Sequence, residues 1–205
     1  MFNFFYTNTT AMNKSISDIR EEKKQQRQLL DDEYQTFAAM EIAHRLSKFS
    51  VINRAIHIAT YMPFGGEVNC QHFLNFGKLR KKRIFLPILA KSKLIFLPLK
   101  SGGKLLKNHY GILEPVYKKR EVIAACDLDI VIVPLVAFDK QCNRLGMGGG
   151  FYDRSFAFRK HRQKWRKPLL IGVAYDFQRV SALQPQTWDV PLDAVVTEKE
   201  CYGSH

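Results

Sequence analysis

A glycine-rich segment at residues 146–150 constrains the fold of this chain more than any other feature. Glycine fills four of the five positions, in the order Gly-Met-Gly-Gly-Gly. Because glycine lacks a Cβ atom, it tolerates positive φ angles and lets another group approach the main chain closely. The apolar run 130–138 before the segment predicts a buried strand, and residues 151–160 after it can form a helix. The sequence therefore predicts a strand, a glycine-rich loop and the start of a helix.

This arrangement favours the binding of a phosphate group. The N–H groups of a loop and of a helix start point partial positive charge at an anion, and Arg144 and Arg154 flank the loop. The loop is not a Rossmann fingerprint, because Phe151 stands where a third spaced glycine or alanine is required. It is not a Walker A loop either, because no Gly-Lys-Ser/Thr follows. The alternative is a simple tight turn between strand and helix.

Length and composition predict one globular domain. The chain has 205 residues, of which 46% are hydrophobic and 25% charged, enough to bury a substantial core. Strand-like and helix-like patterns alternate, which predicts an α/β fold: a three-layer sandwich with a mainly parallel central sheet. The segments 83–89 and 94–99 predict an antiparallel hairpin added to that sheet. We expect the domain to cover residues 14–205 and residues 1–13 to form a disordered extension.

The net charge of +13 indicates an anionic partner. Nucleic acid, an acidic membrane, a nucleotide and a polyglutamylated small molecule all fit that charge. No apolar run approaches the roughly 20 residues that a membrane helix needs. The four cysteines include no C-x-x-C pair, which argues against a zinc site and a disulfide framework. We therefore expect a cytoplasmic protein with reduced thiols and no membrane partner.

The N-terminal region predicts two helices. Residues 15–30 are highly charged, and Ser15 and Asp18 have the spacing of a capping box. Asp31 and Asp32 introduce a second helix with an apolar stripe. Its apolar positions are Tyr34, Phe37, Ala38, Ile42, Leu46 and Phe49. Taken alone, the basic residues of the first helix predict a solvent-exposed face; they are Arg20, Lys23, Lys24 and Arg27.

The segment 144–154, Arg-Leu-Gly-Met-Gly-Gly-Gly-Phe-Tyr-Asp-Arg, follows Pro-Leu-Val-Ala-Phe-Asp at 134–139. Together they resemble the signature of the 5-formyltetrahydrofolate cyclo-ligases, also called methenyltetrahydrofolate synthetases. The family pattern often has lysine where this chain has Gly149. The resemblance implies an enzyme of one-carbon metabolism that uses ATP and Mg²⁺. Such an enzyme cyclises 5-formyltetrahydrofolate to 5,10-methenyltetrahydrofolate and releases ADP and phosphate.

The resemblance also implies which residues bind ATP. The family carries a basic N-terminal pattern that contacts phosphates, and Arg20 and Arg27 match its two arginines. Ile16 stands where that pattern has lysine, and Lys14 lies two residues earlier. Of these, Arg20 is the residue we assign to ATP. The remaining residues implied in ATP binding are Arg144, Gly146, Met147, Gly148, Gly149, Gly150, Phe151 and Tyr152.

A second set of residues is implied at the folate ring. Glu67 lies in a Gly-Glu-Val setting and Met62 five residues before it, both at positions that line the family's folate pocket. A carboxylate can accept two parallel hydrogen bonds from the N–H edge of a pterin. Without the resemblance, Glu67 predicts only the start of a helix. Tyr110 is a candidate aromatic wall, or else a loop anchor, and Gly148 and Tyr152 would also border the substrate.

Asp153 and Asp189 match the two acids that the family associates with Mg²⁺. Mg²⁺ commonly takes one or two carboxylates together with phosphate oxygens and waters. Without the resemblance, these two aspartates would remain unassigned. The implied reaction transfers the γ-phosphoryl group to the formyl oxygen, after which N10 closes the ring. Positioning and charge neutralisation carry such a reaction, and we assign the catalytic roles to Arg144, Tyr152 and Asp153.

Two alternatives remain open. The first is a nucleic-acid-binding protein, which the charge and the basic stretches 78–83 and 159–167 favour, although no recognition-helix or RNP-like motif is present. The second is another ATP-dependent kinase or ligase on the same fold, since fold does not fix substrate. The expected partners are ATP and 5-formyltetrahydrofolate, with or without a polyglutamate tail, and not nucleic acid. We expect a monomer or a weak homodimer.

Overall fold

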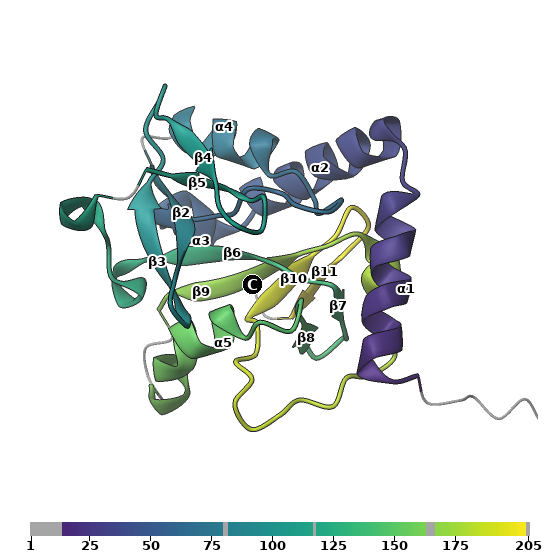
Figure 1. Ribbon diagram of the computed structural model, residues 1–205. Helices are drawn as coiled ribbons and strands as arrows, with labels where there is room; N and C mark the ends of the chain where they lie inside the picture. Colours follow the sequence, from purple (N-terminus) through teal and green to yellow (C-terminus); the bar gives the residue numbers. More distant parts are fainter. Residues whose placement is uncertain (1–13, 80–81, 117, 163–166, 204–205) are drawn as a thin grey trace, which may run out of the picture.

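The computed structural model describes residues 14–79, 82–116, 118–162 and 167–203. The extension expected at residues 1–13 lies outside this range. A seven-stranded sheet runs through the molecule in the order β11-β10-β9-β6-β1-β2-β3, with helices on both faces (Figure 1). This is the α/β sandwich that the sequence predicts. No helix in the described part of the chain is both long and apolar enough to cross a membrane.

The centre of the sheet is parallel and its two edges are antiparallel. β1 (His57–Ala59) pairs with β2 (Arg83–Ala90) and β6 (Ile130–Pro134), β6 with β9 (Leu169–Val173), and β9 with β10 (Ala194–Val196). The edge strands are β3 (Lys93–Pro98), which forms the predicted hairpin with β2, and β11 (Cys201–Gly203). Strands that are buried on both faces need continuous apolar runs, and both β6 and β9 have one.

Two short hairpins lie outside the main sheet. β4 (Leu105–Lys107) pairs with β5 (Leu113–Pro115), and β7 (Ala137–Phe138) pairs with β8 (Arg144–Leu145). The single strand predicted over 130–138 was therefore wrong: the chain leaves the sheet after β6 and enters β7. Gln178 fixes this break, because its side-chain amide donates to the carbonyl oxygens of Leu135 and Val136 at 2.9 and 2.8 Å. The β7–β8 hairpin leads directly into the glycine loop.

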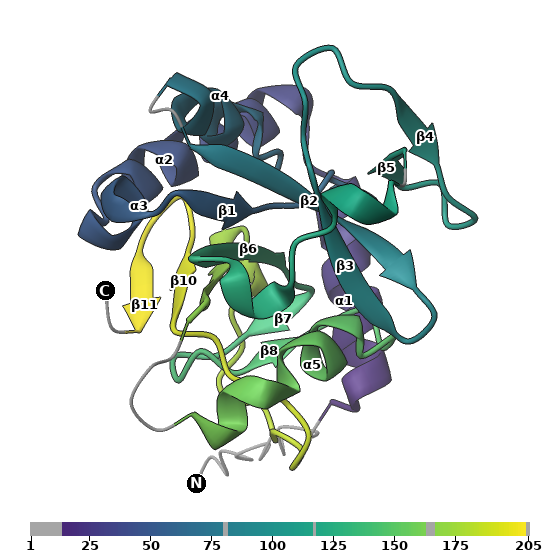
Figure 2. The same cartoon turned by 90° about the vertical axis from the view of Figure 1, so that its left-hand side faces the viewer.

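Helices cover both faces of the sheet (Figure 2). One face carries α2 (Asp32–Ser47), α3 (Ser50–Arg54) and α4 (Gln71–Leu79), and the other carries α5 (Phe151–Phe156). Alternate side chains of β6 enter the two resulting cores, Ile130 and Ile132 on one side and Val131 and Val133 on the other. Short 3₁₀ helices complete the fold: η1 (Lys119–Glu121), η2 (Ala125–Asp127), η3 (Ala157–His161) and η4 (Asp176–Gln178).

The N-terminal helix α1 (Ile16–Gln28) begins with the capping box that the sequence predicts. The Ser15 hydroxyl accepts from the N–H of Asp18 at 3.2 Å, and the Asp18 carboxylate accepts from the N–H of Ser15 at 3.1 Å. The buried residues of α1 are Lys23 and Arg27, which are 9% and 2% exposed. The expectation of a solvent-exposed basic face is therefore wrong for these two residues.

Other predicted elements differ in their extent. The helix predicted over 151–160 changes from α-helix to the 3₁₀ helix η3 after Phe156. In α2, the predicted core position Phe37 is 51% exposed, whereas Ala38, Ile42 and Leu46 are buried. Phe37 packs instead beside Tyr34, with ring centroids 6.2 Å apart.

Candidate functional site

The carboxyl ends of the parallel strands bring the predicted site residues to one edge of the sheet. β1 continues into the loop that contains Glu67, and β6 continues through β7 and β8 into the glycine loop. β9 ends at Val173 and is followed by Ala174 and Tyr175, both buried. Ligands of open α/β sheets bind at this edge. Helix α1 runs along the same side of the molecule (Figure 1).

The glycine loop has the geometry of an anion-binding nest. Gly148 and Gly150 have φ angles of 98° and 61°, which other residues rarely adopt. Within the described chain, the main-chain N–H groups of Met147, Gly148 and Gly149 donate no hydrogen bond. All three residues are exposed. Successive free N–H groups in such a turn present positive potential to an anion.

The ring of Phe151 determines what can stand at position 149. A Cβ atom built on Gly149 would lie 2.9 Å from that ring. A lysine there, as in the family pattern, would require the ring to turn away. The Arg154 guanidinium stacks over the same ring at 5.3 Å and donates to the carbonyl oxygen of Gly149 at 2.5 Å. A cation thus lies beside Gly149 although no lysine stands there. The sequence analysis noted Arg154 as a residue that flanks the loop but assigned it no role in the site.

Arg20 lies beside the glycine loop, as its assignment to ATP requires. Its Nε donates to the carbonyl oxygen of Gly146 at 2.9 Å, across 126 residues of chain. A Cβ built on Gly148 would lie 3.8 Å from the guanidinium carbon of Arg20. Lys14 has no such position: it is 60% exposed and pairs with Glu22 at 2.6 Å.

Arg144 and Asp153, on either side of the glycine loop in the chain, form a largely buried ion pair. The Arg144 Nη2 lies 2.6 Å from Asp153 Oδ1, and the two side chains are 6% and 20% exposed. Arg144 also donates to the carbonyl oxygen of Val190 at 2.5 Å, while Asp153 accepts from the N–H of Val190 at 3.0 Å. The ring of Tyr152 lies 6.0 Å from the guanidinium. These contacts hold the start of α5 against the segment that contains Asp189.

The two predicted metal ligands approach each other through this contact. Asp153 bonds the N–H of Val190, the residue next to Asp189, and Asp189 Oδ2 accepts from the N–H of Gln186 at 2.7 Å. The described residues contain no group of three or more His, Cys, Asp or Glu side chains that could hold a metal. A carboxylate pair fits Mg²⁺ that is also held by phosphate oxygens and water, and does not fit an all-protein cage.

Glu67 lies in a tight turn and is poorly solvated. Its Oε2 accepts from the N–H of Phe64 at 3.2 Å. Burial raises the pKa of Glu67 to about 7, against the opposing positive charge of Arg27. Burial and then the nearby charge of Glu67 raise the pKa of the Tyr152 hydroxyl. The structure therefore brings Glu67 and Tyr152 into electrostatic range of each other.

The other two residues predicted to line the folate pocket, Met62 and Tyr110, differ in how far they are buried. Met62 is partly buried at the end of the β1 segment. Tyr110 is 52% exposed, and its ring centroid lies 3.8 Å from that of His109. The hairpin loop that carries Tyr110 reaches the Glu67 turn, because a Cβ on Gly111 would lie 3.7 Å from the ring of Phe64. The loop is therefore adjacent to the site, while the Tyr110 side chain faces largely toward solvent.

A face of α1 adds Lys23 and Arg27 to Arg20, the only residue of this helix that was assigned to the site. Arg20, Lys23 and Arg27 stand at positions i, i+3 and i+7, so they share one side of the helix. Lys23 Nζ donates to the carbonyl oxygen of Phe177 at 2.7 Å, just beyond β9. Arg27 Nε and Nη1 are buried without a hydrogen-bond partner, as are the Thr60 and Tyr175 hydroxyls. The signal for this face was the helical spacing of the three cations.

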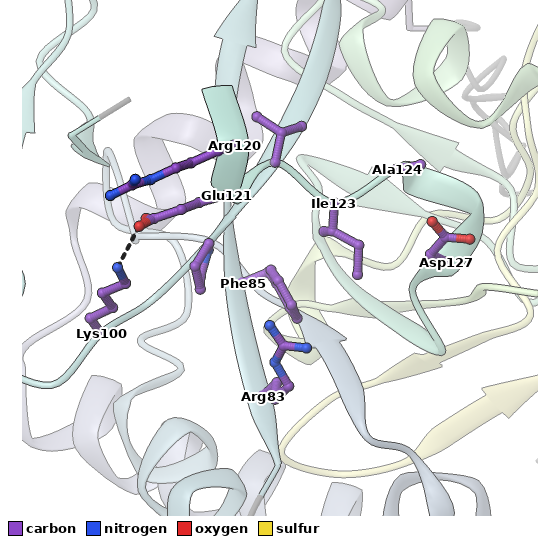
Figure 3. A pocket seen from close by; sticks show the side chains of 10 residues that line it. Arg83, Phe85, Lys100, Arg120, Glu121, Ile123, Ala124 and Asp127 are labelled. Atoms are coloured by element: carbon purple, nitrogen blue, oxygen red, sulfur yellow. Dashed lines mark hydrogen bonds and ion pairs between the residues drawn. The ribbon is translucent and has the colours of Figure 1, made fainter. Parts of the chain in front are cut away.

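A surface pocket of about 490 Å³ lies at the opposite edge of the sheet (Figure 3). Arg83 begins β2 and Asp127 precedes β6, so this pocket lies near the amino ends of the strands. Its Lys100 and Glu121 pair at 2.6 Å. None of the buried, unpartnered polar atoms lines it, and we therefore locate the candidate site at the carboxyl edge. Its full lining is Arg83, Phe85, Pro98, Lys100, Arg120, Glu121, Val122, Ile123, Ala124 and Asp127.

Of the two basic stretches that suggested nucleic acid, the described part of 159–167 is not a continuous exposed surface. Arg159 is 8% exposed and forms an ion pair with Asp193 at 2.6 Å. Residues 80–81 and 163–166 of those stretches lie outside the described residues.

Comparison with known proteins identifies one family. A model described as the 5-formyltetrahydrofolate cyclo-ligase family matches residues 12–198. The chain is 35% identical over 184 residues to 5-formyltetrahydrofolate cyclo-ligase of Escherichia coli (strain K12), covering 87% of this chain and 98% of that protein. It is 40% identical over 144 residues to the Haemophilus influenzae protein of the same name, covering 68% and 74%. The NMR structure of Aquifex aeolicus 5,10-methenyltetrahydrofolate synthetase matches with a TM-score of 0.77 and 30% identity, covering 92% of both chains.

Proposed function

This chain belongs to the 5-formyltetrahydrofolate cyclo-ligase family, and we propose that it uses ATP and Mg²⁺ to cyclise 5-formyltetrahydrofolate to 5,10-methenyltetrahydrofolate. ADP and phosphate are the other products. One observation carries the proposal: three exposed N–H groups without partners, at residues 147–149, stand beside Arg20. That loop begins the helix whose Tyr152 lies in electrostatic range of Glu67. A loop that can bind phosphate thus lies near Glu67, a carboxylate that can accept hydrogen bonds from a pterin ring.

The chemistry needs an activated formyl group. The formyl oxygen attacks the γ-phosphorus of ATP; an O–P bond forms, the bond to the β-phosphate oxygen breaks, and ADP leaves. N10 then attacks the formyl carbon, which forms the C–N bond of the five-membered ring. N10 loses its proton, phosphate departs with the electrons of the C–O bond, and the methenyl cation remains. Because the ring closes within one molecule, alignment of the formyl oxygen with the γ-phosphate is the main task of the protein.

The glycine loop and the neighbouring cations perform the charge neutralisation. The free N–H groups at 147–149 hold phosphate oxygens, and Arg20 and Arg154 add positive charge on either side of the loop. Asp153 orients Arg144, whose guanidinium borders Tyr152. Mg²⁺, held by Asp153 and Asp189, would neutralise charge on the phosphates. Several fixed positive charges are needed because the negative charge of the transferred phosphoryl group is spread over several oxygens.

Glu67 holds the pterin ring on the other side. Its carboxylate accepts from the ring N3–H and the 2-amino group, two donors with the spacing of a carboxylate. A pKa of about 7 leaves Glu67 partly protonated at neutral pH. The pterin donors stabilise the ionised form, so substrate binding is coupled to proton release from Glu67.

Purified protein tests the proposal directly. With 5-formyltetrahydrofolate and MgATP it should produce the conjugated methenyl chromophore, with one ADP released per chromophore formed. Omitting ATP, or chelating Mg²⁺, should abolish the signal. ATP consumption without the chromophore would favour a different kinase. A folded protein that forms no chromophore but shifts a nucleic-acid probe would favour the nucleic-acid alternative.

A further inference from the structure

Arg27 is a buried cation without a hydrogen-bonding partner on two of its nitrogen atoms. Its side chain is among the largest fully buried ones, and the residue is 2% exposed. Nε and Nη1 have no hydrogen-bond partner. A buried charged group that lacks hydrogen bonds is strongly destabilising. Such a group is retained where something outside the chain, water or a ligand, completes its bonds.

The surroundings of Arg27 belong to the substrate side of the site. Gly66, next to Glu67, packs on the main chain of Arg27, since a Cβ there would lie 3.2 Å from the Arg27 carbonyl oxygen. Arg27 acts electrostatically on both Glu67 and Tyr175. Among the described residues, no ion pair within 4.0 Å joins Arg27 to Glu67. The cation and the carboxylate therefore stand near each other without touching.

Helix α1 separates two functions along one face. Arg20 bonds the glycine loop, and Arg27 lies seven residues later, a rise of about 10 Å along the helix. Two turns of helix place both side chains on the same side. The cation near Gly146 thus marks the phosphate end of the site, and Arg27 marks the end near Glu67.

We propose that Arg27 donates hydrogen bonds to the C4 carbonyl oxygen of the pterin ring whose N3–H and 2-amino group are bound by Glu67. This inference rests on the proposed function, and it names the atom that Arg27 recognises. In a 2-amino-4-oxopteridine the acceptor O4 stands directly beside the donor N3–H. A cation close to a carboxylate, but not in contact with it, matches that order of donor and acceptor.

The pairing would make the site selective for the 4-oxo ring. A 4-amino analogue presents an NH₂ group, which cannot accept, where Arg27 requires an acceptor. The buried guanidinium would then remain unpaired, which is the kind of mismatch that gives strong discrimination. Removing Arg27 should therefore weaken binding of the 4-oxo substrate and leave the 4-amino analogue nearly unaffected.

Isotope-edited infrared spectroscopy tests the contact itself. The complex of the protein with 5-formyltetrahydrofolate is prepared without ATP, so that no turnover occurs, with ¹³C either at C4 or in the formyl group. In the unsubstituted protein the C4 carbonyl band should shift to lower frequency on binding. Arg27→Met should abolish that shift, and Arg27→Lys, which keeps one donor, should reduce it. Lys24→Met, which removes a partly exposed charge one turn earlier in α1, should leave the band where it is.

Binding measurements complete the test. Arg27→Met should raise the Kd of 5-formyltetrahydrofolate by roughly tenfold or more, since a bond to a charged donor is lost, with little change for the 4-amino analogue. An unchanged C4 band in both Arg27 variants, or an equal loss of affinity for both ligands, would overturn the inference. The inference would also be overturned if the formyl band, and not the C4 carbonyl band, responded to substitution of Arg27. If Arg27→Met does not fold, Arg27→Lys decides the question by the same band. The unsubstituted protein must form the methenyl chromophore, so failure of the proposed function is detected separately.

Discussion

At the residue scale, two largely buried ion pairs of similar geometry allow effects on stability to be distinguished from effects on catalysis. Arg144–Asp153 and Arg159–Asp193 both have a shortest N–O distance of 2.6 Å, and their arginine side chains are both 6% exposed. Only the first pair flanks the glycine loop in the chain. The second joins η3 to the segment before β10. Removing one partner of such a pair leaves an uncompensated buried charge.

Asp153→Asn and Asp193→Asn should therefore destabilise the protein to a similar extent, by about 3–5 kcal/mol. Only Asp153→Asn should also lower kcat and raise the Mg²⁺ concentration that gives half-maximal activity. Urea unfolding and Mg²⁺ titration of the activity measure the two effects. An equal change in Mg²⁺ dependence in the Asp193 variant would show that the effect is one of stability.

The raised pKa of Glu67 makes a second prediction at this scale. The pKa rises from 4.5 in the unfolded chain to about 7 in the folded protein, so the folded state binds more protons between these values. The free energy of unfolding should consequently fall as the pH rises from about 4.5 to 7, by up to roughly 3 kcal/mol.

Glu67→Gln should remove that pH dependence, because glutamine does not titrate. Urea midpoints at pH 5 and pH 8, in the absence of ligand, measure it. The same substitution should raise the KM for 5-formyltetrahydrofolate more than the KM for ATP. Equal increases in both KM values would contradict the assignment of Glu67 to the pterin ring.

At the scale of elements, the glycine loop depends on its backbone angles more than on available space. Gly148 has a φ of 98°, while Gly146 has no positive φ and open space at its Cβ position. Gly148→Ala should cost about 1–2 kcal/mol through backbone strain, and Gly146→Ala should cost much less. Thermal unfolding compares them, at about 2–4 °C per kcal/mol for a chain of this size. Equal losses would show that loop strain is not the cause.

The elements that the sequence predicts well are those whose signals are local. The capping box at Ser15 and Asp18 marks the start of α1, and a continuous apolar run marks β6. β11 was missed because three residues give too short a pattern. The break between β6 and β7 was also missed, since it is held by Gln178 from a distant part of the chain.

In the site too, features with a local sequence signal were predicted, and features that depend on distant contacts were not. Spacing and resemblance point to the glycine loop, and the structure brings Arg20 to it. The burial of Lys23 and Arg27 could not be predicted, because a charged helix is normally solvent-exposed and only tertiary contacts reverse this. The cation beside Gly149 belongs to Arg154, in the first turns of α5. Only the folded loop reveals this contact.

At the scale of the whole molecule, the net charge of +13 should act on the rate of substrate capture. Raising the ionic strength from about 0.05 to 0.5 M shortens the Debye length from more than 10 Å to less than 5 Å. The value of kcat/KM should fall several-fold over this range while kcat changes little. The decrease should be steeper for a polyglutamylated folate than for the monoglutamate. A parallel fall in kcat would indicate salt damage to the site itself.

Helix α1 buries two cations, Lys23 and Arg27, and no apolar side chain within its span. Both cations lie on the same face as Arg20. ATP bound at the Arg20 end and the pterin bound at the Arg27 end would thus each hold helix α1 in place. The ligand that binds first bears most of the conformational entropy cost of ordering α1, and the second ligand binds to a helix that is already ordered. The two substrates should therefore bind with positive cooperativity although they occupy opposite ends of the helix. By thermodynamic reciprocity, each should tighten the binding of the other by the same factor.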